Sequence, residues 1–433
     1  MQCTITSASI PGADVLTRKP GLAKVARLFP PELVRSLVRL RRDLHRHPEL
    51  SFQEHRTAAR LERALAAVRP ASLERVAGTG LVARIRGRSH SVPAVAIRGD
   101  IDALPIQEQT GLPFSSRIPG VMHACGHDVH ATWAVGAAAL LSARPPAGDV
   151  VVLLQPAEET GTGAQAMIEA GVLDGVAAIF GGHVDRRFAV GQVVAQPGSL
   201  AAASDTFEIE IAGAGAHGAR PHEGKDPIVA AAALIAALQT IVSRRLHPAT
   251  PAVVTVGSVH AGSAPNVIPD SARLSGTLRA LEGETREKLH HALRQIAGDI
   301  ARAYGVEAKV AIELGPPPLI NHETAVHWAR QAVEEILGKS ALVPLGSPNL
   351  AGEDFAWYLE RIPGCFLRIG AREEGTEPIP AHSPQFYAAE EAIWVGAAVL
   401  AQAARVASAS LAARGGGPEA DPEQRQARRR RQK

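Results

Sequence analysis

Apolar and polar residues along this chain form blocks that predict buried strands alternating with helices. The apolar runs at residues 94–100 and 149–156 each end in polar residues, which is typical of strands inside a sheet. Between them, the Ala- and Leu-rich segment 131–143 predicts a helix, and an earlier helix is expected to begin at Pro30 and Pro31. Strands that alternate with helices indicate an α/β fold, whose chemistry lies at the carboxyl ends of the strands.

A second pattern begins near residue 200, where residues 207–211 alternate apolar with polar, as in a strand that has one solvated face. Further strands are expected at 253–256, 272–278 and 306–314, and helices at 228–242 and 283–304. This α+β module interrupts the first domain, which resumes with helices near 323–337 and 390–413. The predicted organisation is an N-terminal extension over 1–29, a first domain over 30–200 and 317–413, an inserted domain over 201–316, and a disordered basic tail over 414–433.

Composition and charge narrow the class of protein. At 433 residues, with 46% hydrophobic and 21% charged residues, the chain has the composition of a globular protein of two or three domains. The net charge of +3 lies partly in the basic tail, so the folded body is near neutral and nothing favours nucleic-acid binding. Three widely spaced cysteines do not suggest a disulfide framework, and no apolar stretch reaches the length of a membrane span without interruption. We therefore expect a soluble, cytoplasmic protein with no membrane or nucleic-acid partner.

Residues 123–130 crowd a thiol, three imidazoles and a carboxylate into one short segment. Cys125 and His127 form a C-x-H pair, and Gly126 between them permits the turn that would direct both side chains to one point. Thiolate and imidazole ligands suit zinc and its first-row neighbours, whereas calcium and magnesium prefer oxygen. From this segment alone, Cys125 can be a metal ligand, a nucleophile or a small buried residue.

Further candidate ligands follow other apolar runs. Glu158 and Glu159 come just after a predicted strand, where one carboxylate can bind metal and the other can serve as general base. The alternative for this pair is a solvated acidic loop. His183 ends another apolar run, and His382 lies in a loop with flanking prolines. Five side chains together would suffice for two metal ions with one bridging ligand: Cys125, His127, Glu159, His183 and His382.

Asp100 ends the predicted strand at 94–100, and Asp102 comes just after it. They can bind metal, or accept a hydrogen bond from a ligating imidazole and fix its tautomer, and we favour the second role. In the inserted domain, His217 follows a strand, and Asn266 and Arg279 occur at other strand edges. An arginine offers a fork for a substrate carboxylate, and His or Asn can stabilise a developing oxyanion.

With these motifs assembled, the chain resembles the di-metal aminoacylase and carboxypeptidase family. The similarity is to its amidohydrolase branch, which includes hippurate hydrolases, N-acyl-amino-acid amidohydrolases and auxin-conjugate hydrolases. It extends from about Leu37 to about Ala404, and its motifs occupy residues 45–51, 98–105, 123–130, 155–163, 182–184, 217–227, 266–270, 276–279, 352–355 and 382. Three departures are the charged segment 185–187, the small residues at 201–203, and Ser383 after His382.

The resemblance implies a central mixed-sheet catalytic domain of the zinc-exopeptidase type, with an inserted ferredoxin-like domain that acts as a lid and forms a homodimer. It implies that Cys125 bridges two divalent ions, of zinc, manganese, cobalt or nickel, and that Glu158 is the general base. It also implies that His217 reaches the active site of the other subunit, while Asn266 and Arg279 hold the substrate. The remaining metal ligands would be His127, Glu159, His183 and His382.

The activity that the resemblance implies is metal-dependent hydrolysis of the amide bond in small N-acyl amino acids, such as hippurate or N-acetyl and indole-acetyl amino acids. The alternatives are a di-metal carboxypeptidase or dipeptidase, a non-catalytic binding homologue, and a metal-free hydrolase with Cys125 as nucleophile.

Overall fold

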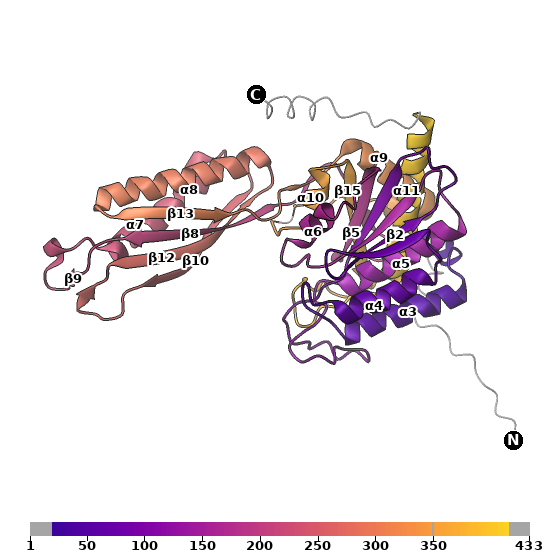
Figure 1. Ribbon diagram of the computed structural model, residues 1–433, viewed down its shortest axis with the longest axis horizontal. Helices are drawn as coiled ribbons and strands as arrows, with labels where there is room; N and C mark the ends of the chain where they lie inside the picture. Colours follow the sequence, from indigo (N-terminus) through magenta and orange to yellow (C-terminus); the bar gives the residue numbers. More distant parts are fainter. Residues whose placement is uncertain (1–19, 349, 415–433) are drawn as a thin grey trace, which may run out of the picture. The chain divides into compact units, whose positions relative to one another are not determined.

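The computed structural model describes residues 20–348 and 350–414, which form two compact units, each with its own sheet (Figure 1). One unit contains residues 20–197, Asn321–Leu345 and residues 358–414. The other contains Gly198–Ile320 and the short segment Gly346–Trp357. The tail predicted over 414–433 lies outside the described residues, apart from Arg414.

The larger unit is built on a seven-stranded sheet with the order β1-β2-β4-β3-β5-β15-β6. The neighbouring strands β4, β3, β5 and β15 are parallel, so their carboxyl ends share one edge of the sheet, whereas β1, β2 and β6 pair antiparallel. Near-continuous apolar residues in β4 explain its burial on both faces. The strands are β1 Ser72–Val76, β2 Gly80–Ile85, β3 Ala94–Asp100, β4 Val150–Gln155, β5 Val176–Ala189, β6 Val193–Val194 and β15 Gly364–Arg372.

Helices cover this sheet, and α5 (His127–Ala143) and α11 (Glu391–Ala413) pack closely against each other. A Cβ atom at Gly396 would lie 2.2 Å from the ring of Trp133, so the glycine allows this close approach. The other helices of the unit are α2 Pro20–Ala26, α3 Pro31–Arg46, α4 His55–Ala66, α6 Gly163–Glu169, α9 Glu323–Leu337 and the short η3 Lys339–Ala341. Along the chain, the boundary between the units after Trp357 falls within α10 Ala356–Leu359.

One expectation about this unit was wrong. Residues up to Phe29 were expected to be a loose extension, but α2 buries Leu22 and Val25, and the ring of Phe29 lies 5.7 Å from that of Trp394. By length and composition α11 would suffice to cross a membrane, although Gln402 and Arg405 interrupt its apolar run. Since 78% of that stretch is buried within the fold, α11 has the character of a core helix.

The inserted unit is an antiparallel four-stranded sheet, in the order β10-β12-β8-β13, packed against α7 and α8. Strand β8 alternates buried with exposed residues, as the sequence pattern predicts. The chain order β8-α7-β10-β12-α8-β13 is the split β-α-β-β-α-β arrangement of ferredoxin-like domains. The elements are β8 Ala203–Ala212, α7 Pro227–Leu238, β10 Ala252–Ala261, β12 Ser271–Ala280, α8 Gly283–Tyr304 and β13 Glu307–Glu313.

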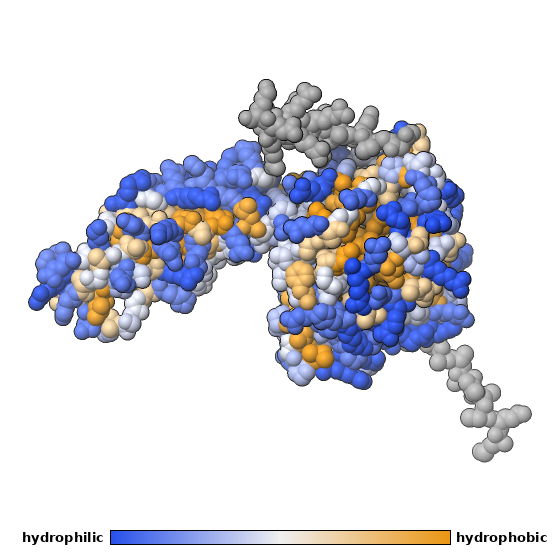
Figure 2. All heavy atoms as spheres, in the orientation of Figure 1, coloured by the Kyte–Doolittle hydropathy of each residue, from blue (hydrophilic) through white to orange (hydrophobic). Residues whose placement is uncertain are grey.

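Short elements complete this unit: β7 Gly198–Ala201 pairs with β14 Leu319–Asn321, β9 Ala216–His217 pairs with β11 Val267–Ile268, and η1 Pro221–Glu223 and η2 Ile241–Arg245 lie in connections. On the face drawn in Figure 2, apolar patches interrupt the hydrophilic surface of this unit. Its large exposed apolar side chains include Ile228, Val229, Val259 and Val267. The predicted fold class, an α/β domain with a mixed sheet and an α+β insertion, is confirmed.

Candidate metal centre

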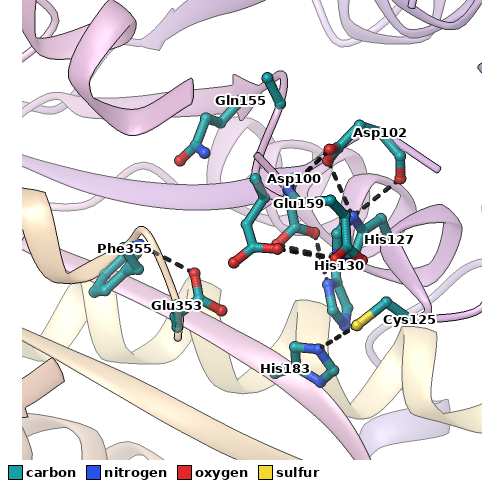
Figure 3. A network of polar contacts seen from close by, with 12 residues as sticks. Asp100, Asp102, Cys125, His127, His130, Gln155, Glu159, His183, Glu353 and Phe355 are labelled. Atoms are coloured by element: carbon teal, nitrogen blue, oxygen red, sulfur yellow. Dashed lines mark hydrogen bonds and ion pairs between the residues drawn. The ribbon is translucent and has the colours of Figure 1, made fainter. Parts of the chain in front are cut away.

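The five predicted ligands converge at the carboxyl edge of the larger sheet. The Sγ atom of Cys125 lies 3.1 Å from Nε2 of His183 (Figure 3). Cys125 belongs to two groups of side chains whose candidate ligand atoms lie within 4.8 Å of one another: Cys125, His127 and His183, and Cys125, Glu159 and His382. The structure therefore brings all five predicted ligands together, with Cys125 common to both groups.

A glycine with a left-handed backbone conformation lies between Cys125 and His127. Gly126 has a φ of 88° and is the N-cap of α5, so Cys125 lies in the turn and His127 is the first helical residue. A Cβ atom at Gly126 would lie only 2.4 Å from Cγ2 of Val184. The position thus requires glycine both for its backbone conformation and for its packing.

A strained turn presents the adjacent carboxylates. Ala157 has a φ of 53°, and its backbone N–H donates to Oε1 of the buried Glu54 at 3.0 Å. Beyond this turn, Oε2 of Glu158 lies 3.9 Å and Oε1 of Glu159 lies 3.7 Å from Nε2 of His127. Both carboxylates therefore face the same imidazole. Glu54, which the sequence did not single out, stabilises the turn at Ala157 that leads from β4 to these carboxylates.

Asp102 orients His127, as the sequence led us to expect. Its Oδ1 lies 3.1 Å from Nδ1 of His127, while its Oδ2 accepts from the backbone N–H of Glu159 at 3.0 Å and from the Ser51 hydroxyl at 2.8 Å. With the proton of the imidazole on Nδ1, Nε2 presents its lone pair to the site. Asp102 thereby fixes one imidazole and the backbone of one carboxylate residue together.

Asp100 was expected to orient a ligating imidazole, but the imidazole that it contacts most closely is not one of the five predicted ligands. It forms an ion pair with Arg98, and its Oδ1 lies 2.6 Å from Nδ1 of His130. Nε2 of His130 accepts from the backbone N–H of Val184 at 2.9 Å, next to His183. Sequence reasoning missed this role of His130, although its place one helical turn after His127 in the same motif was a usable signal.

Burial dominates the electrostatics of the cluster. It lowers the pKa of His183 well below the usual value, which keeps that imidazole neutral. Burial, followed by the Glu159 charge, raises the pKa of the Cys125 thiol, and burial raises the pKa of Glu159 to about 7. Although burial alone would raise it, the pKa of Asp102 is lowered by its hydrogen bond with His127. A cation at this point would favour the ionised thiol and carboxylate.

The donor set fits a metal ion. Among the described residues, Nε2 of His127 and Oε1 of Glu159 are buried and have no hydrogen-bond partner. Nε2 of His382 lies 3.5 Å from Oε2 of Glu159, and the backbone N–H of His382, which has a φ of 65°, donates to Ala124 O at 2.8 Å. Mixed sulfur, nitrogen and oxygen donors suit zinc and its first-row neighbours.

The inserted unit brings together two of its three predicted residues. His217 on β9 pairs in register with Val267, next to Asn266, whose carbonyl accepts from the backbone N–H of Gly218 at 2.8 Å. Arg279 lies near the C-terminal end of β12, where its guanidinium donates to the Ser204 hydroxyl. The ten residues of β12 span roughly 30 Å at about 3.3 Å each, so Arg279 is distant from the other two within this unit.

A mixed sheet that carries thiol, imidazole and carboxylate donors at the ends of its parallel strands, beside a further carboxylate, defines a metal-dependent hydrolase. Residues 96–406 match the family described as Peptidase family M20/M25/M40, and the chain belongs to that family. It is accordingly a hydrolase that acts on linear amides, as the sequence predicted.

Similar proteins agree with this assignment. The chain is 45% identical over 345 residues, covering 78% of this chain and 81% of the relative, to an N-acetyl-L-cysteine deacetylase of Bacillus subtilis. It is 39% identical over 375 residues, covering 85% and 86% of the two chains, to the IAA-amino acid hydrolase ILR1-like 5 of Arabidopsis thaliana. A solved structure of a dinuclear metal-binding M20 peptidase from Bacillus subtilis superposes with a TM-score of 0.75 at 39% identity, covering 87% and 99%.

Proposed function

We propose that this protein hydrolyses the amide bond of N-acyl amino acids, with Glu158 as general base. The observation that carries the proposal is the pair of adjacent carboxylates on one turn. Glu159 faces His127 and His382, while Oε2 of Glu158 lies 3.9 Å from Nε2 of His127. One of these carboxylates can bind metal while its neighbour, close to the same imidazole, accepts a proton. The names of the relatives, a deacetylase of N-acetyl-L-cysteine and a hydrolase of IAA-amino acids, support this substrate class.

Two divalent ions, held by Cys125, His127, Glu159, His183 and His382, would supply the Lewis acidity that polarises the scissile carbonyl and acidifies the attacking water. Glu158 takes the proton from that water and returns it to the leaving amine. Asp102 keeps the His127 imidazole in the tautomer that presents Nε2. Zinc, manganese, cobalt and nickel all suit this donor set.

The protein would act as a homodimer formed through its inserted unit. Exposed apolar side chains on that unit support this, since Val229, Val259 and Val267 are 50%, 46% and 51% exposed. In such a dimer His217 would polarise the carbonyl at the other subunit's site, and Asn266 and Arg279 would hold the substrate. The buried free thiols Cys125 and Cys365 are compatible with a reducing cytoplasm.

A hydrolysis screen of metal-reconstituted protein tests the substrate class. It would compare N-acetyl, N-benzoyl and indole-acetyl amino acids with small dipeptides, detecting the free amino acid. We expect turnover of at least one N-acyl series, and none in metal-free protein. Turnover of dipeptides alone would replace the proposal with a peptidase activity, and turnover of none would refute it.

A further inference from the structure

Arg368 lies beside the metal centre on strand β15. It pairs in register with His183 on the parallel neighbour β5. Residues paired in this way project to the same face of a sheet from strands about 4.8 Å apart, so the Arg368 side chain stands next to that of His183. The side chain is also buried, because Arg368 is only 7% exposed.

This guanidinium lacks a counter-charge. In the part of the chain that the structure describes, the other three buried arginines each pair with a carboxylate: Arg41 with Asp128, Arg98 with Asp100, and Arg186 with Glu373. The guanidinium of Arg368, in contrast, forms no hydrogen bond or ion pair with any described side chain or backbone group. Its guanidinium carbon lies 5.6 Å from the ring centroid of Phe366.

Among the described residues, no Arg368 nitrogen is both fully buried and without a partner, so the guanidinium keeps some access to solvent and an anion can reach it. Partial burial without a counter-charge is still unfavourable, and an arginine cannot relieve the cost by losing its proton. A bound anion would remove the penalty. The planar fork of the guanidinium matches the two oxygens of a carboxylate. The neighbouring His183 is a candidate metal ligand, so an anion at Arg368 would lie within the reach of a small substrate held at the metal centre.

We propose that Arg368 determines specificity by binding a second carboxylate of the substrate, so that N-acyl amino acids with two carboxylates are preferred; this rests on the function proposed above. The α-carboxylate present in every such substrate already has a proposed partner in Arg279. The second carboxylate can come from a dicarboxylic acyl group or from an acidic side chain of the amino acid, and both sources present the same chemistry to Arg368.

Binding measurements separate the two sources. In metal-loaded Glu158→Gln protein, calorimetry would give Kd for N-acetylglutamate against N-acetylglutamine, and for N-succinylalanine against its neutral terminal amide. Each pair differs only in the second charge. We expect the carboxylate to bind tenfold or more tightly in at least one pair, and the preference to fall below about threefold after Arg368→Met, because a charge-assisted hydrogen bond contributes at least that factor.

The matched control is Arg372→Met on the same strand, since Arg372 already donates to Thr376 O at 2.7 Å. This variant should keep the preference, and Arg368→Lys should keep part of it. The inference is overturned if the protein with Arg368 intact shows no preference for the second carboxylate. It is also overturned if Arg368→Met weakens the binding of both members of each pair equally, because Arg368 would then bind the α-carboxylate.

Hydrolysis by the protein with Glu158 intact keeps the two proposals apart. If none of the four compounds and no other N-acyl amino acid is cleaved, the proposed function fails. If they are cleaved with no preference for the second carboxylate, only the assignment of Arg368 fails.

Discussion

Replacement of Asp102 by Asn should loosen metal binding without removing any ligand. Asp102 accepts from the backbone N–H of Glu159 at 3.0 Å and from Ser51 at 2.8 Å, and it meets Nδ1 of His127 at 3.1 Å. The Asn side chain has a single oxygen, which can take the place of Oδ1 or of Oδ2 but not of both. If the NH₂ group takes the place of Oδ2, the backbone N–H of Glu159 loses its acceptor. If it takes the place of Oδ1, Nδ1 of His127 keeps the Asp102 carbonyl at 3.0 Å, but the NH₂ group itself is left without an acceptor.

The expected magnitude follows from that lost acceptor. An unsatisfied buried donor costs about 1–3 kcal/mol, which corresponds to roughly 5- to 160-fold weaker metal binding if the cost falls on the orientation of His127 or Glu159. Competition against a chelator of known affinity, followed by metal analysis, measures this factor. The side chain is fully buried, so solvent cannot replace the lost contact.

Asp149→Asn is the matched control, because Asp149 also accepts from a backbone N–H, that of Gly87 at 2.9 Å, but precedes the opposite end of β4. It should leave the metal affinity unchanged. An affinity of Asp102→Asn within about threefold of the original protein, or an equal loss in the control, would refute the role assigned to Asp102.

Two further predictions concern stability. Although burial opposes its ionisation, Asp205 has a lowered pKa because Arg286 and His290 hydrogen-bond to it. The ionised Asp205 therefore stabilises the folded protein fully above about pH 4, the pKa of an unfolded Asp, and this stabilisation is lost as the pH falls through the folded pKa. Asp205→Asn should therefore unfold more easily in urea at pH 7, with a difference that shrinks toward pH 3; a constant difference would contradict this. Gly126→Ala should lower the melting temperature, because its Cβ would lie 2.4 Å from Val184 at a φ of 88°, and an unchanged melting temperature would show that the turn relaxes freely.

Elements whose pattern is local could be predicted from the sequence. The ranges expected for β3 at 94–100, α8 at 283–304 and α9 at 323–337 agree with the structure. Each combines a run or period of apolar residues with a clear boundary, such as Gly305, which ends α8 in the left-handed conformation. The convergence of the ligands was also predictable, since parallel strands bring their carboxyl ends to one edge.

Contacts between distant segments left no such signal. Glu54 supports the turn at Ala157 from 103 residues away, and α2 reaches the core through only a few apolar residues in a mixed segment. The grouping of Gly346–Trp357 with the inserted unit is likewise set by tertiary packing. Asp100 and Asp102 were given one role from sequence, and only the geometry shows that they orient different imidazoles.

The most direct test of the central claim compares metal content and turnover in Glu158→Gln with those of the original protein, both reconstituted with the same metal. The exposed Glu169→Gln in α6 serves as the control. General base catalysis typically contributes about 10²- to 10⁴-fold, so we predict a fall of at least 100-fold in turnover at unchanged metal stoichiometry. Near-normal turnover, or a loss of metal in proportion to activity, would contradict the assignment of Glu158 as the base.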